Sequence, residues 1–102
     1  MTLPASTSIA KKLGARRGAE ETFNWTKKHK IITATVSDAT AVRAIEKFAD
    51  DHLCLVEPSC AAGLAAIYEN IPELEEVLKP VREQGRKPLV VVEVCGGNGI
   101  SL

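Results

Sequence analysis

The chain has 102 residues, of which 45% are hydrophobic and 25% are charged. These proportions are ordinary for a soluble globular domain, and the length allows one domain with a small core. Thirteen basic and thirteen acidic residues cancel. The balance excludes the strongly basic face that is typical of nucleic-acid-binding proteins, so no nucleic-acid partner is expected.

The sequence carries no sign of membrane insertion, secretion or a structural metal. No apolar run approaches the ~20 residues of a membrane-spanning helix. The first residues lack the basic and apolar regions of a secretory signal. Three cysteines, Cys54, Cys60 and Cys95, include no CxxC pair, and the two histidines lie apart from them. We therefore expect reduced thiols, no metal site and a cytoplasmic location.

The first third of the chain predicts two helices and a strand. Residues 7–14 predict a short helix, which Thr7 or Ser8 can cap and Gly14 can end. Residues 15–29 predict a second helix with a rough apolar stripe and basic residues at its end, although Gly18 weakens it. Residues 30–36, KIITATV, are β-branched and predict a strand.

The middle of the chain contains the clearest helix. Residues 37–52 begin with Ser37 or Asp38 as a cap, and apolar side chains recur at helical spacing at Ala41, Ala44, Ile45 and Phe48. Residues 53–57, LCLVE, predict a short strand. Pro58 then opens a helix that is apolar on nearly every face, which predicts that this helix is buried.

The remaining residues complete an α/β pattern. Residues 71–87 predict a surface helix bracketed by Pro72 and Pro80, and residues 88–95, PLVVVEVC, predict a final strand apolar enough to be central. The alternation predicts a partial three-layer α/β fold, with a mostly parallel sheet and flanking helices. Three short strands cover little of the helix at residues 59–69, so we expect that some partner structure is missing.

Two places carry candidate chemistry. Glu57 ends a predicted strand just before a helix, and ligands in open α/β sheets bind outside the carboxyl ends of strands. The alternative is that the Glu57 charge stabilises the following helix N-terminus. Cys95, Gly96 and Gly97 follow the last predicted strand. The two glycines would let the backbone approach a flat ligand closely, and the thiol would offer it a weak hydrogen-bond donor. The alternative is that these residues form only a tight turn with one buried thiol.

Four stretches occur together in one order: TSIAKKLGA, VSDATAVRAIEKFADDH, LVEPSCAAGLAAIY and VVVEVCGGNGISL. Together they resemble the C-terminal part of the serine dehydratase family, the L-serine/L-threonine ammonia-lyases, over roughly residues 2–102. The resemblance implies part of the large domain of a fold type II enzyme dependent on pyridoxal phosphate. It also implies serine and threonine as substrates, which yield pyruvate or 2-oxobutanoate with ammonia, and a homodimer in the full-length protein.

The resemblance also assigns roles to residues. It implies that Cys95 faces the pyridine nitrogen of the cofactor, that Gly96 and Gly97 lie against its ring, and that Glu57 lies near the active-site side. A neutral thiol would leave the ring nitrogen unprotonated, which gives a weaker electron sink that suits elimination from serine. The chain departs from the family at Gly63, because the family glycine usually stands two positions earlier.

No lysine of this chain lies in the context that the family uses for its Schiff base, and no glycine-rich phosphate loop is present. The resemblance therefore implies that residues 1–102 are an incomplete, C-terminal portion of one enzyme domain, inactive as an isolated chain. Two alternatives stay open. One is a non-catalytic chain or partner subunit that pairs with a full-length enzyme, and the other is a small nucleotide-binding module that uses GGNG.

Overall fold

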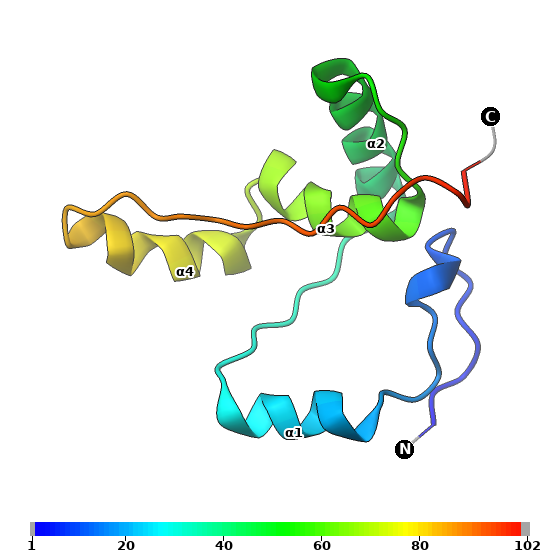
Figure 1. The fold of residues 1–102 in the computed structure, drawn as a ribbon, viewed down its shortest axis with the longest axis horizontal. Helices are drawn as coiled ribbons and strands as arrows, with labels where there is room; N and C mark the ends of the chain where they lie inside the picture. Colours follow the sequence, from blue (N-terminus) through cyan, green and yellow to red (C-terminus); the bar gives the residue numbers. More distant parts are fainter. Residues whose placement is uncertain (1, 101–102) are drawn as a thin grey trace.

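A computed structural model describes residues 2–100 of the chain (Figure 1). The elements in order are the 3₁₀ helix η1 (Lys11–Leu13) and the helices α1 (Glu20–Lys28), α2 (Asp38–His52), α3 (Pro58–Tyr68) and α4 (Pro72–Glu83). Figure 1 shows α3 near the centre with α2 above it, α4 lying out to the left and α1 at the bottom. The C-terminal segment runs from the end of α4 back toward α3.

The predicted α/β fold with a mostly parallel sheet is wrong for residues 2–100, which contain helices and no strand. Residues 30–36, 53–57 and 88–95, the three predicted strands, are irregular in secondary structure and form no ladder. A backbone hydrogen bond runs from the Glu57 N–H to the Gly96 carbonyl at 3.0 Å, where a sheet needs a repeating row of such bonds. β-Branched residues favour extended backbone, but they cannot supply the neighbouring strand.

Helix α2 forms where the apolar spacing predicts it. Ser37 is its N-cap, and the Ser37 Oγ accepts a hydrogen bond from the Thr40 N–H at 3.1 Å. The face of α2 that carries Ala41, Ala44 and Ile45 is buried. This helix therefore supplies one side of the core.

Helix α3 packs against α2 and supplies the other side. Pro58 begins it at the first helical position, as expected. Polar contacts attach the C-terminal end of α3 to α2: the Tyr68 hydroxyl donates to the Asp51 carboxylate at 2.8 Å, and Glu69 pairs with Arg43 at 3.4 Å. The core consists of small and medium apolar side chains: Ala41, Ala44, Ile45, Val56, Cys60, Ala61, Leu64 and Ala65.

Three expectations about the other helices need correction. Residues 7–14 predict a helix, but η1 is only three residues long. Helix α1 begins at Glu20 rather than near residue 15, because Gly14 and Gly18 disfavour helix before it. Pro80 lies inside α4 instead of ending it. Helix α3 is not buried on all sides, since Ile67 is 39% exposed.

A large apolar surface remains uncovered. The chain exposes 7977 Å², whereas a folded monomer of 10.9 kDa exposes about 5600 Å². Its radius of gyration is 15.2 Å, compared with about 13 Å for a compact chain of this length. Val91, in the segment predicted to be central, is 86% exposed, and Leu89 is 90% exposed. The prediction of a two-sided buried strand is therefore wrong within residues 2–100, because only Val92 of this segment packs against the core and the residues around it face water.

Candidate functional site

The four residues singled out in the sequence come together at the start of α3. Glu57 is the residue that precedes α3, and Cys95, Gly96 and Gly97 lie at the end of the C-terminal segment. The Glu57 N–H donates to the Gly96 carbonyl at 3.0 Å, so the turn after Cys95 is attached to the beginning of the helix. Their proximity was expected, although a sheet edge is not what produces it.

Cys95 is held against a second thiol. Its backbone N–H donates a hydrogen bond to the Cys60 Sγ at 3.2 Å, and Cys60 is buried in α3 while Cys95 is exposed. Desolvation of the Cys95 thiol raises its pKa, and Cys60, Glu93 and Glu57 nearby add to the effect. The Cys95 thiol is therefore kept in its neutral, protonated form near neutral pH.

The two glycines after Cys95 meet different surroundings. Gly96 has a φ of +143°, which side-chain-bearing residues rarely adopt, and open space lies where its Cβ would stand. A Cβ on Gly97 would clash with the Leu55 carbonyl oxygen. Gly96 thus leaves room for an approaching group, whereas Gly97 lets two backbone segments of this chain pack closely.

Glu57 is occupied by a partner from the N-terminal segment. Glu57 is 8% exposed as a whole residue, and its Oε2 lies 2.7 Å from the Lys12 Nζ. The carboxylate makes no capping hydrogen bond to α3. A Cβ on Gly99 would clash with the same carboxylate oxygen. The Glu57 side chain therefore joins two remote parts of the chain.

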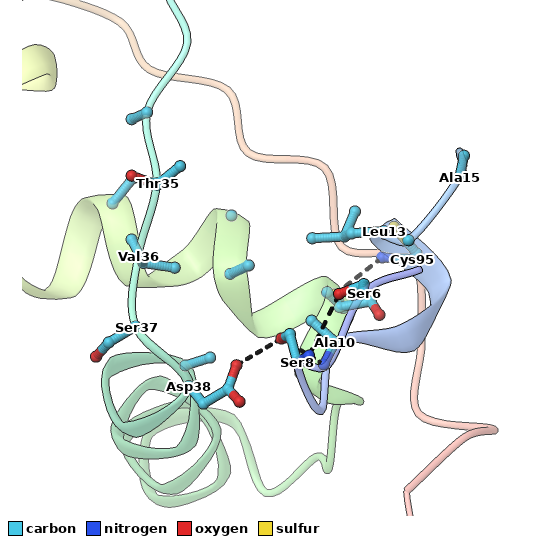
Figure 2. Close-up of a pocket in the computed structure, with 18 of the residues that line it drawn as sticks. Ser6, Ser8, Ala10, Leu13, Ala15, Thr35, Val36, Ser37, Asp38 and Cys95 are labelled. Carbon is cyan, nitrogen blue, oxygen red and sulfur yellow. Dashed lines mark hydrogen bonds between the residues drawn. The ribbon is translucent and has the colours of Figure 1, made fainter. Parts of the chain in front are cut away.

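A cavity of about 740 Å³ opens beside these residues. It is lined by the N-terminal segment, residues 34–38, α3, Glu93 and Cys95 (Figure 2). At its edge the Ser8 hydroxyl donates to the Asp38 carboxylate at 2.5 Å, which ties the N-terminal segment to the start of α2. Of the predicted site residues only Cys95 lines this cavity, so Glu57, Gly96 and Gly97 form its support rather than its wall.

Sequence reasoning missed three residues of this region: Lys12, Cys60 and Gly99. Each acts through a residue far away in the sequence, and no local motif marks such a contact. Within residues 2–100, no three metal-ligating side chains gather into a possible metal site. Nor does any helix in that range combine the length and apolar character needed to cross a membrane.

Comparison with known proteins gives clear relatives, although no family model matches the chain. A bovine L-serine dehydratase/L-threonine deaminase is 45% identical over 106 aligned residues, which cover 100% of this chain and 31% of the bovine protein. The human L-serine dehydratase/L-threonine deaminase is 41% identical over 102 residues, covering 100% of this chain and 30% of that protein.

A solved structure has a backbone similar to that of this chain. The crystal structure of a fungal L-serine ammonia-lyase from Rhizomucor miehei matches with a TM-score of 0.81 and 29% sequence identity, covering 99% of this chain and 30% of that chain. The resemblance to the serine dehydratase family is therefore confirmed in sequence and in backbone. The chain spans about 30% of the length of these relatives.

Proposed function

We propose that this chain is part of an L-serine/L-threonine ammonia-lyase, which converts serine to pyruvate and threonine to 2-oxobutanoate, each with release of ammonia. The observation that carries the proposal is the 45% identity to a bovine L-serine dehydratase/L-threonine deaminase over the whole chain. Residues 1–102 would form an incomplete, C-terminal portion of one domain. The Schiff-base lysine lies outside this portion.

The residues around Cys95 fit pyridoxal phosphate as the cofactor. The raised pKa of the Cys95 thiol keeps it neutral, which suits contact with an unprotonated ring nitrogen. Gly96 leaves open space for a flat ring to approach. When bound, the cofactor supplies the electron sink for the negative charge that develops at the substrate α-carbon.

In this proposal the residues of the chain bind and orient rather than transfer protons. Cys95 sets the protonation state at the ring nitrogen, and Gly96 and Gly97 allow the backbone to lie beside the ring. Glu57 lies on the active-site side, but its carboxylate is paired with Lys12 and does not contact the ring. Glu57 acts on the ring region indirectly, by holding the turn after Cys95. The chain alone would therefore carry out no turnover.

The uncovered apolar surface supports the view that the folded unit is larger than this chain. The chain exposes more surface than a compact monomer of its mass does, and this surface includes the side chains of Leu89 and Val91. In the longer protein, other parts of the same chain would bury them. Assembly of the longer protein as a homodimer and its location in the cytoplasm are parts of the same proposal.

A chimaeric enzyme tests the proposal. The aligned section of the bovine relative is replaced by residues 1–102, and pyruvate formation from serine and 2-oxobutanoate formation from threonine are measured. We expect activity with at least one substrate. Cys95→Asp should lower the yield of 2-oxo acid, because a carboxylate would hold a proton on the ring nitrogen and the stronger electron sink would favour side reactions over elimination. A chimaera that folds and binds the cofactor but turns over neither substrate would overturn the proposal.

The same exposed surface favours one second candidate, a non-catalytic chain that pairs with a full-length enzyme. The test is to mix the chain with the full-length relative and to follow complex formation by size-exclusion chromatography with light scattering. A stable complex of defined stoichiometry would support this candidate, and elution of two separate species would reject it.

A further inference from the structure

A buried carboxylate and a single cation meet at the start of α3. The Glu57 side chain is 11% exposed and the Lys12 side chain is 57% exposed, with 2.7 Å between Oε2 and Nζ. A carboxylate that is removed from water is costly unless it is paired. The most buried charged residue of the core region thus depends on a lysine from the 3₁₀ helix η1.

Lys12 is itself fixed in place. Its backbone N–H donates to the Ser59 Oγ at 3.1 Å, so η1 is attached to the first turn of α3. The Lys12 backbone and side chain therefore contact neighbouring residues of the same helix start. This double attachment gives the ammonium a defined position beside Glu57.

Glu57 in turn holds the segment after Cys95. Its N–H donates to the Gly96 carbonyl, and its carboxylate occupies the space where a Cβ on Gly99 would stand. The Ile100 N–H donates to the Gly97 carbonyl at 3.1 Å and closes the turn. The backbone from Gly96 to Ile100 is thus packed against one charged side chain.

We propose that Lys12 is a positioning residue: by pairing with Glu57, it lets this buried carboxylate hold the turn Gly96–Ile100 in place behind Cys95. The value of this arrangement for catalysis rests on the proposed function, but the arrangement itself is tested without any assay of activity. Without Lys12, the Glu57 carboxylate keeps its charge but loses its partner in this buried place, so it no longer has a fixed position against Gly99.

Hydrogen exchange on the full 102-residue chain is the first test. The Ile100 amide is the probe, because its hydrogen bond closes the turn. We expect Lys12→Met to speed exchange in residues 96–100 by about two- to fivefold, because the loss of local stability is on the order of one ion pair. Lys12→Arg should restore slow exchange. Lys11→Met is the matched control, since Lys11 neighbours Lys12 in η1 and has no ion pair within residues 2–100.

The pH profile of Cys95 alkylation is the second test, carried out in a Cys54→Ser background with peptide mapping. The charged and titratable groups that face this thiol are Cys60, Glu93 and Glu57, with Lys12 behind Glu57. Lys12→Met leaves the Glu57 charge uncompensated and should shift the profile to higher pH. Glu57→Gln removes that charge and should shift the profile to lower pH.

Opposite shifts separate a positioning role from simple loosening, which would move both profiles in the same direction. The proposal is overturned if Lys12→Met leaves exchange at residues 96–100 unchanged, or if this segment already exchanges fully within seconds in the parent chain. Shifts of the same sign in both variants would also overturn it. The chimaera described above can fail independently of all these results.

Discussion

The backbone N–H of Cys95 donates a hydrogen bond to the sulfur of Cys60, 35 positions earlier in the chain, at 3.2 Å. This contact fixes the end of the C-terminal segment on a buried side chain of α3. The buried Cys60 therefore sets the place of the thiol that we propose to face the cofactor. After desolvation, the nearby Cys60 thiol is a further cause of the raised pKa of the Cys95 thiol.

Cys60→Ala, which removes the hydrogen-bond acceptor, should destabilise the fold more than Cys60→Ser, which replaces the sulfur by an oxygen. Cys60→Ala leaves the Cys95 N–H without its acceptor and leaves a small void, which should lower the free energy of unfolding by about 1–3 kcal/mol. Cys60→Ser keeps an acceptor at the same place and should cost less. Urea unfolding followed by far-UV circular dichroism measures both, and equal losses would show that the hydrogen bond contributes nothing.

The Cys95 thiol should react slowly in the folded chain. Its pKa is raised, chiefly by desolvation, so less thiolate is present at pH 8 than in the unfolded chain. We expect slower iodoacetamide alkylation of Cys95 in buffer than in concentrated urea at the same pH, read by peptide mapping. A rate that does not change on unfolding would contradict the raised pKa.

The same shift fixes the sign of a pH effect on stability. A raised pKa means that the folded chain holds the thiol proton more tightly than the unfolded chain does. The contribution is complete below the pKa of the unfolded thiol and is lost as pH rises through the folded value. Thermal unfolding from pH 7 to pH 10 should therefore show a larger loss of stability in the parent chain than in Cys95→Ala, and the reverse order would refute this account.

The contact between α2 and α3 should not tolerate a larger side chain. Ala65 is 0% exposed within the core, so Ala65→Leu should lower the free energy of unfolding by about 1–3 kcal/mol through overpacking. Ala66, the next residue of α3, is only half-buried, and Ala66→Leu is the matched control with a smaller expected loss. Equal losses in urea unfolding would indicate that the two helices do not pack as described.

The isolated chain should be marginally folded or prone to self-association. Its exposed apolar segments, including Leu89 and Val91, leave more surface in water than a compact monomer of this mass does. We expect the apparent mass in light scattering to rise with concentration. An apparent mass that stays at the monomer value over the whole concentration range would contradict this expectation.

Local signals in the sequence predicted the central helices well. The apolar spacing from Ala41 to Phe48 and the cap at Ser37 gave α2, and Pro58 gave the start of α3. The three predicted strands failed for a non-local reason. Their composition favours extended backbone, but a strand exists only beside another strand, and residues 2–100 do not provide that pairing.

The candidate site divides in the same way. Glu57, Cys95, Gly96 and Gly97 stand out because of their types and places in the sequence, and the structure brings them together. The partners Lys12 and Cys60 did not stand out, since a lysine in a polar stretch and a cysteine in an apolar helix are ordinary. Only the folded chain shows that these two residues contact the site.

The most direct test of the central claim, that this chain is a segment of an ammonia-lyase, is the genomic or transcript sequence immediately upstream of the codon for Met1. The account predicts an open reading frame that continues upstream and encodes a lysine in the cofactor context and a glycine-rich phosphate loop. An in-frame stop codon preceded by a promoter would contradict the catalytic proposal and leave the non-catalytic partner as the account to test.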